Sequence, residues 1–337
     1  AAAFAVITAV TLMPALLGAF GRFLFKPKLP LVAPIFPPPP GPAPPPGPPR
    51  GGGAVAVART LANQPLRQHR SLADMDIPLA FFERTERGFE ALPMAVSAWS
   101  PDMVNGPAIC GLLGGALESA HRPDGFIPAR LTVDLFRPTL RKPVEVTTTE
   151  VRRGTRIAVA DAELLQEGRA VARATAVFLR PSAQPPGRVW TRQERPDLPP
   201  AELLDGSISH LWHTDTTGWS ARLSEHQNAE RKRNFQQPIS VILGEPPSPL
   251  AAAATIGEST SMMSHWGDRG VGFINADLTL TMSRLPHGAI GVQAENHFST
   301  DGVAVGNATL FDRDGFFGAC VVTALANPAA QVDFSGA

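Results

Sequence analysis

Residues 273–286 alternate between apolar and polar side chains. On an extended strand, Leu278, Leu280 and Met282 would face one side, and Asp277 would open the opposite, polar side. The pattern therefore predicts a strand with one buried face. The carboxylate at the start of its polar face is either a solvated edge charge or a placed catalytic group.

A similar stretch occurs earlier in the chain. Residues 126–138 match residues 273–286 at an offset of 147 (273 − 126), with the letters F-I-x-A-x-L-T in common, and weaker matches further along keep this offset to within one residue. Such self-similarity predicts two copies of one structural unit. The first copy carries Arg130 where the second carries Asp277, so the shared scaffold does not require a carboxylate there.

Each copy is predicted to contain an apolar helix followed by four strands. The first helix begins near Asn105, which can cap it, and Pro107 suits its first turn. A helix that is apolar on most faces must be wrapped by other structure, so we expect an α+β unit in which an antiparallel sheet wraps around the helix. The expected helices are residues 105–118 and 249–266, and the expected strands are residues 127–136, 144–151, 157–165 and 170–179, then 273–283, 288–295, 303–311 and 316–324.

The first 74 residues differ from the rest in composition. Residues 1–25 begin with 21 uncharged residues, and the segment could span a bilayer with the basic residues that follow on the cytoplasmic side. Part of it resembles the last transmembrane helix of the MMPL lipid exporters, so it is either a membrane anchor or a fusion remnant. Residues 26–74 are rich in Pro and Gly, which predicts an extended linker.

Charge and cysteine content narrow the function classes. The formal net charge is zero, and no basic run is interleaved with aromatic residues, so nucleic acid is not an expected partner. Cys110 and Cys320 lie far apart without a CxxC spacing, which favours neither a zinc site nor a disulfide framework. No metal or redox cofactor is expected.

Two tandem helix-then-sheet units resemble the thioesterase-like superfamily of actinobacterial proteins, which are similar to acyl-CoA thioesterase II. The likeness is carried by the F-I-x-A-[RD]-L-T strands, by residues 105–113 and 244–249, and by residues 301–315. It implies a double hotdog fold. Residues 75–185 would form the first hotdog, residues 186–240 a connecting segment, and residues 241–337 the second hotdog.

The resemblance also implies a site. In acyl-CoA thioesterase II an Asp, a Thr or Ser, and a Gln hold a water molecule, and the Asp corresponds to Asp277. The hydroxyl position falls in a stretch that includes Asn296 and His297. The Gln position falls at Val322 or Thr323. Because neither is Gln, Thr323, Asn296 and His297 are expected to replace part of the family's set.

We therefore expect hydrolysis of acyl-CoA-type thioesters by water activated at Asp277, with the acyl chain between the two apolar helices. Pairing of the two hotdogs would bring the helix start at Asn105 and Gly106 to the site, where backbone N–H groups can hold an oxyanion. The absent Gln leaves a non-catalytic acyl-CoA-binding protein as the alternative. We further expect a homo-oligomer in the cytoplasm, with an optional tether to the inner face of the plasma membrane through residues 1–25.

Overall fold

The computed structural model describes residues 79–204 and 210–336. The predicted apolar segment at residues 1–25 and the predicted linker at residues 26–74 lie outside these ranges. Within them, no helix combines the length and the apolar character that crossing a membrane requires.

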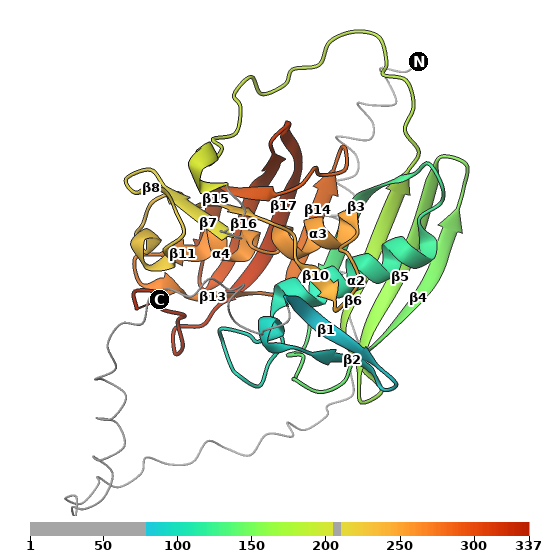
Figure 1. The fold of residues 1–337 in the computed structure, drawn as a ribbon, viewed down its shortest axis with the longest axis horizontal. Coiled ribbons are helices and arrows are strands. Elements are labelled where there is room, and N and C mark those ends of the chain that lie inside the picture. The colour runs from blue at the N-terminus through green and yellow to red at the C-terminus, as the bar shows by residue number, and fades with distance from the viewer. Residues whose placement is uncertain (1–78, 205–209, 337) are drawn as a thin grey trace, which may run out of the picture. The chain divides into compact units, whose positions relative to one another are not determined.

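Most strands belong to one large sheet of 12 strands (Figure 1). Neighbouring strands in it run antiparallel, and β13 (Phe273–Asn275) pairs with β17 beside the main path. Across the sheet the order is β4 (Glu145–Arg153), β5 (Ile157–Gln166), β6 (Arg169–Leu179), β3 (Ile127–Asp134), β14 (Asp277–Met282), β17 (Gly315–Ala326), β16 (Val303–Asp312), β15 (Ile290–Thr300), β9 (Arg233–Gln236), β7 (His210–Thr214) and β8 (Gly218–Ser220).

The two copies join at the centre of this sheet. Strands β3 and β14, which lie within the two repeated stretches, pair antiparallel with Leu131 opposite Leu280. Leu278, Leu280 and Met282 are buried, as the alternation predicted, and Leu131 is buried opposite them. The predicted α+β double hotdog architecture is therefore confirmed, with strands β3 to β6 from the first copy and β13 to β17 from the second.

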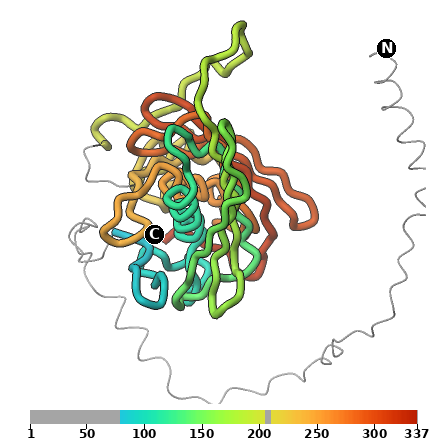
Figure 2. The backbone as a smooth tube through the Cα atoms, turned by 90° about the vertical axis from the view of Figure 1, so that its right-hand side faces the viewer, coloured from blue at the N-terminus to red at the C-terminus, as the bar shows by residue number. Residues whose placement is uncertain are grey.

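Helices cover the inner face of the sheet, and the sheet curves around them (Figure 2). Helix α2 (Gly106–His121) has Asn105 as its N-cap, as predicted. The second predicted helix is instead two, α3 (Pro249–Gly257) and α4 (Thr260–His265). The chain tightens between them, where the Ser259 N–H donates to Ile256 O and the Ser261 N–H donates to Glu258 O, both over three residues.

Helices α2 and α3 pack against each other through small residues. A Cβ built on Gly111 would lie 2.2 Å from Thr255 Oγ1, and one built on Gly115 would lie 3.4 Å from the Ala251 Cβ. The later α2 residue thus meets the earlier α3 residue, so the helices run antiparallel. Contacts this close leave no room for the acyl chain that was expected to lie between the two helices.

Smaller elements complete the fold. Residues 186–240, expected as a connection, contribute β7, β8 and β9 to the large sheet through pairing of β9 with β15. The remaining elements are a small sheet of β10 (Ser240–Ile242), β1 (Ala80–Thr85) and β2 (Gly88–Ala91), a pair formed by β11 (Trp266–Gly267) and β12 (Gly270–Val271), and the 3-10 helices η2 (Pro93–Ala95), η3 (Ala201–Leu203) and η4 (Leu223–His226).

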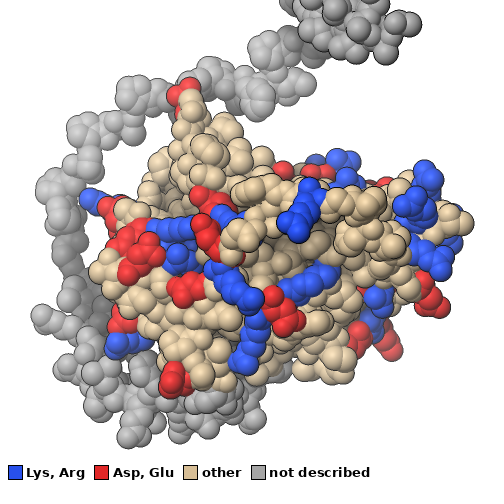
Figure 3. Space-filling view, turned by 90° about the horizontal axis from the view of Figure 1, so that it is seen from above, with Lys and Arg blue, Asp and Glu red and all other residues tan. Residues whose placement is uncertain are grey.

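Charged side chains of both signs are mixed on the surface shown in Figure 3. Many of the molecule's basic groups form ion pairs, including Arg231 with Glu295 and Arg233 with Asp215. The face in this view therefore presents no continuous field of one sign.

Candidate functional site

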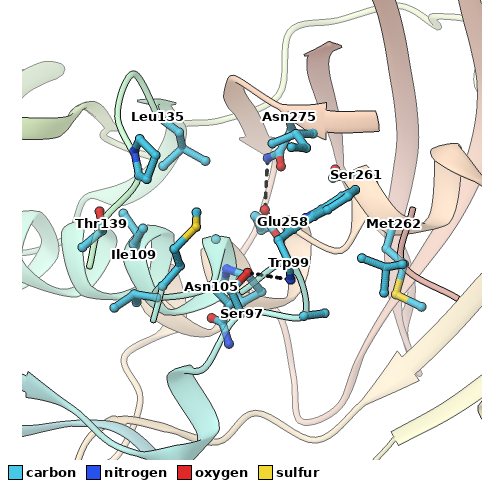
Figure 4. Close-up of a pocket in the computed structure, with 18 of the residues that line it drawn as sticks. Ser97, Trp99, Asn105, Ile109, Leu135, Thr139, Glu258, Ser261, Met262 and Asn275 are labelled. Carbon is cyan, nitrogen blue, oxygen red and sulfur yellow. Dashed lines mark hydrogen bonds between the residues drawn. The ribbon is translucent and has the colours of Figure 1, made fainter. Parts of the chain in front are cut away.

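A cavity of about 320 Å³ opens beside the start of α2. Both copies contribute to its wall, and most of the side chains that line it are apolar. The apolar part includes Trp99, Met103, Ile109, Leu135, Phe136, Met262, Val271, Phe273, Val332 and Phe334. Its few polar groups, among them Asn105, Glu258, Ser261 and Asn275, converge on one region (Figure 4). An apolar cavity with a few convergent polar groups is the usual form of a small-molecule site.

Glu258 is the carboxylate of this cavity. It follows the last residue of α3, and only 7% of its surface is exposed. Its Oε1 accepts a hydrogen bond of 3.0 Å from Asn275 Nδ2. Burial raises the pKa of Glu258 to about 7, against the opposing effect of the Asn275 hydrogen bond. Near neutral pH this carboxyl group can therefore both accept and return a proton.

Gly106 stands directly against Glu258. It is the first residue of α2, and a Cβ at this position would lie 2.0 Å from Glu258 Oε1, so only glycine fits without displacement. Within the described ranges, the Gly106 N–H forms no backbone hydrogen bond. The next residue, Pro107, has no backbone N–H. The first residue of a 16-residue helix, at the positive end of its dipole, thus lies beside the carboxylate.

Asn105 holds this helix start in place. Its Oδ1 accepts from the Ala108 N–H at 2.9 Å, and its Nδ2 donates to Met94 O at 2.9 Å and to Val96 O at 3.3 Å. Both polar ends of the side chain are engaged by the backbone. Asn105 and Gly106, two of the predicted site residues, therefore lie at the cavity, but the group that they face is Glu258.

A β-bulge explains why Asn275 points into the cavity and Asp277 does not. The pairing with β17 shifts by one residue between Asn275↔Ala324 and Thr279↔Val321, so Ala276 is the extra residue. Bulges of this kind turn the side chains on either side of them to different faces of the sheet. Asn275 shares the inner face with the buried Ala324, whereas Asp277 lies on the outer face.

Asp277 and Thr323, both predicted as catalytic, are neighbours. The Asp277 Oδ1 accepts a hydrogen bond of 2.6 Å from the Thr323 backbone N–H. Neither residue lines the cavity that contains Gly106 and Glu258. The structure thus brings these two predicted residues together, but on the outer face of the sheet.

Asn296 and His297, the other predicted catalytic residues, line a different cavity of about 490 Å³. The His297 Nδ1 lies 2.8 Å from the Nδ1 of His265, at the end of α4. Burial lowers the pKa of His265 to about 4, and His297 contributes in the same direction. Phe273 lines both cavities and separates this histidine pair from the region of Glu258.

Sequence analysis missed Glu258, Asn275 and Ser261 as site residues. Ser261 is 8% exposed, lies about one turn beyond Glu258 and also lines the cavity. One signal was available: Glu258 is the single Asp, Glu, Lys or Arg between Pro249 and His265. A lone carboxylate in an apolar helical segment is costly to bury and is therefore a functional candidate.

No group of three or more His, Cys, Asp or Glu side chains in the part of the chain that the structure describes could hold a metal ion. In the cavity, a buried carboxyl group lies beside a helix N-terminus. Such a pair can move a proton at one atom and stabilise negative charge at another.

Comparison with known proteins agrees with the fold and with the predicted resemblance. Residues 95–179, from η2 to the end of β6, match the family model of the acyl-CoA thioesterase N-terminal domain. A search of curated proteins found no significant match. The predicted likeness to the thioesterase-like superfamily is confirmed by the family model together with the solved structures below.

Three solved structures share the fold at low sequence identity. The TesB protein of Mycobacterium avium subspecies paratuberculosis is 16% identical over 73% of this chain and 96% of its own, with a TM-score of 0.52. A putative thioesterase II from Thermobifida fusca is 17% identical over 75% and 99%, with a TM-score of 0.51. A hotdog-fold protein of unknown function from Alicyclobacillus acidocaldarius is 16% identical over 76% and 98%, with a TM-score of 0.53.

Proposed function

We propose that this protein hydrolyses acyl-CoA-type thioesters, with Glu258 as the general base and the Gly106 N–H as the oxyanion donor. The observation that carries the proposal is the contact between the Glu258 carboxylate and the start of α2 inside an apolar cavity. The match of residues 95–179 to an acyl-CoA thioesterase domain supports the choice of a thioester.

Substrate would bind with its acyl chain against the apolar wall of the cavity. Desolvation of this chain supplies binding energy of roughly 0.8 kcal/mol per buried CH₂ group. The thioester carbonyl oxygen would then lie at the Gly106 N–H, where the dipole of α2 polarises it. This placement leaves the carbonyl carbon within reach of a water molecule held by Glu258.

Hydrolysis would proceed in two proton transfers. Ionised Glu258 accepts a proton from water as the water oxygen forms a bond to the carbonyl carbon, and the resulting oxyanion is held by the Gly106 N–H. The carbon–sulfur bond then breaks, and protonated Glu258 returns the proton to the departing thiolate. A base whose pKa lies near 7 suits both steps, because its ionised and its protonated form are both populated near neutral pH.

Asn275 and Ser261 would assist Glu258. The hydrogen bond from Asn275 fixes the position of the carboxylate. Ser261 follows Glu258 by three residues and lines the same cavity, so its hydroxyl would share the same water.

Thiol release from a panel of acyl-CoA substrates, together with calorimetric binding of the same compounds, tests this function. We expect the full chain to release one equivalent of thiol for each acyl-CoA consumed. Saturable binding without thiol release would reject hydrolysis in favour of the acyl-CoA-binding alternative.

Two further expectations join this proposal. Location of the protein in the reducing cytoplasm is supported by two free, buried cysteines, Cys110 and Cys320.

A homo-oligomer is supported by Phe298, Val303 and Leu325, which are each more than half exposed on neighbouring strands of the large sheet. Light scattering of the full chain would reject the oligomer if it gave the mass of a monomer.

A further inference from the structure

The helix pair carries a second buried carboxylate at the end opposite to Glu258. Glu118 lies near the end of α2, is 5% exposed, and its Oε2 accepts a hydrogen bond of 2.8 Å from the Leu250 N–H. Leu250 is the second residue of α3. A carboxylate of α2 thus meets the start of α3, just as Glu258 beyond α3 meets the start of α2.

The two ends of the helix pair differ in whether the first backbone N–H groups of the helix have hydrogen-bond partners. At the start of α3, Ser248 accepts from the Ala251 N–H, and Glu118 takes the N–H of Leu250. At the start of α2, the Gly106 N–H has no backbone partner in the described residues, and Gly106 lines a cavity. At the start of α3 two backbone N–H groups are thus bonded to side chains, whereas the first N–H of α2 has no such partner in the described residues.

Glu118 makes a hydrogen bond between α2 and α3, whereas the other contacts described between these helices are van der Waals contacts of small residues. Between the two ends, α2 and α3 touch through Gly111, Gly114 and Gly115 against Thr255, Ala254 and Ala251. Small residues permit close approach but do little to resist sliding of one helix along the other. A hydrogen bond from a helix N-terminus to a carboxylate, reinforced by the helix dipole, fixes the axial position.

We propose that Glu118 is a positioning residue for the reaction described above: by fixing the start of α3, it sets where Glu258 stands against Gly106. Helix α3 has nine residues and spans roughly 13 Å, so it transmits a shift at one end to the other as a short rigid rod. The contact at Gly106 tolerates little movement of α3, because the Glu258 carboxylate occupies the position that a Cβ of residue 106 would take.

The surroundings of Glu258 make its own titration a suitable readout. The nearby titratable groups are the thiols of Cys110 and Cys320. Burial raises the pKa of both thiols, that of Cys320 to about 12, so they stay neutral across the range of interest. The pKa of Glu258 therefore depends mainly on burial and on the hydrogen bond from Asn275. A displaced α3 would admit water, and the pKa would fall toward that of an exposed carboxyl group.

The test is a ¹³C NMR titration of Glu258 in the full chain, assigned by loss of the signal in Glu258→Gln. In Glu118→Ala we expect the pKa of Glu258 to fall by on the order of half a unit or more, and kcat for thioester hydrolysis to fall by about 10- to 100-fold. Glu118→Gln keeps an oxygen for the Leu250 N–H and should lie nearer to the wild type. Glu118→Asp, which is shorter by one methylene group, serves if the alanine variant does not fold.

Asp312→Asn is the matched control. Asp312 is another buried carboxylate, paired with Arg284, and it lines no part of the cavity. It should lower the melting temperature without moving the titration of Glu258. An unchanged Glu258 pKa in the Glu118 variants, or an equal shift in Asp312→Asn, would overturn the positioning role. Because the titration requires no turnover, a wild type without thioesterase activity would reject the proposed function and still leave this test decisive.

Discussion

Glu258 Oε1 lies against Gly106, so close that a Cβ at residue 106 would be 2.0 Å away. The contact joins the segment after one central helix to the first residue of the other, and hence the two copies of the repeat. It places a proton acceptor and a helix N-terminus at the same cavity. The predictions below follow from this arrangement.

Gly106→Ala should abolish most activity, because the added methyl group must displace the Glu258 carboxylate. We expect kcat/KM for acyl-CoA to fall by at least about 100-fold. Gly115→Ala is the control in the same helix, since its methyl group would meet Ala251 at an ordinary 3.4 Å. Equal kcat/KM values for the two variants would contradict the role of the Gly106 contact.

The pH profile should report the ionisation of Glu258. A general base acts when ionised, so kcat/KM should rise with pH through a pKa of about 7. The hydrogen bond from Asn275 lowers this pKa, so its removal in Asn275→Ala should move the rise to higher pH. A rise that stays in place or moves to lower pH in the variant would rule out Glu258 as the titrating base.

Stability should show the cost of the same buried carboxylate. Burial raises the pKa of Glu258 from 4.5 unfolded to about 7 folded, so the folded state binds the proton more tightly. This contribution to stability is fully present below about pH 4.5 and is lost as the pH rises through 7.

Glu258→Gln removes this dependence. At pH 8 the variant should exceed the wild type in unfolding free energy by on the order of 2 to 3 kcal/mol, and the difference should shrink toward pH 4.5. Urea denaturation at the two pH values measures it. A difference that is independent of pH would indicate that Glu258 keeps an ordinary pKa.

A larger side chain on the apolar wall of the cavity should change the acyl-chain length that the protein prefers. Met262 lines the cavity, and Met262→Trp would occupy part of its volume of about 320 Å³. We expect KM to rise by about tenfold or more for long acyl chains, because each excluded CH₂ group loses roughly 0.8 kcal/mol, and to change little for acetyl-CoA. A uniform change across all lengths would mean that the chain binds elsewhere.

Local patterns predicted most of the elements. The Asn105 cap and Pro107 marked the start of α2 to within one residue, and the alternation of Leu278, Leu280 and Met282 identified the buried face of the central strand. These signals depend on neighbouring residues alone. The repeat predicted two copies of one structural unit, and β3 and β14, from equivalent positions in the two copies, pair at the centre of the sheet.

The site depended on features that no local pattern contains. An uninterrupted strand through residues 273–286 would place Asn275 and Asp277 on one face, but the bulge at Ala276 separates them. The importance of Glu258 comes from the antiparallel contact of α2 with α3, which brings it to a residue 152 positions earlier in the chain (258 − 106). Catalysis by Asp277 stays a prediction from the family resemblance.

The most direct measurement compares thiol release by Glu258→Gln and Asp277→Asn under the same saturating acyl-CoA. Each variant replaces a carboxylate by an amide of the same shape, so binding and folding should be largely retained. Our account predicts that kcat falls by about 10²- to 10⁴-fold in Glu258→Gln and by less than about threefold in Asp277→Asn, whose carboxylate lies on the outer face with the Thr323 N–H. Full activity in Glu258→Gln, with loss in Asp277→Asn, would contradict it.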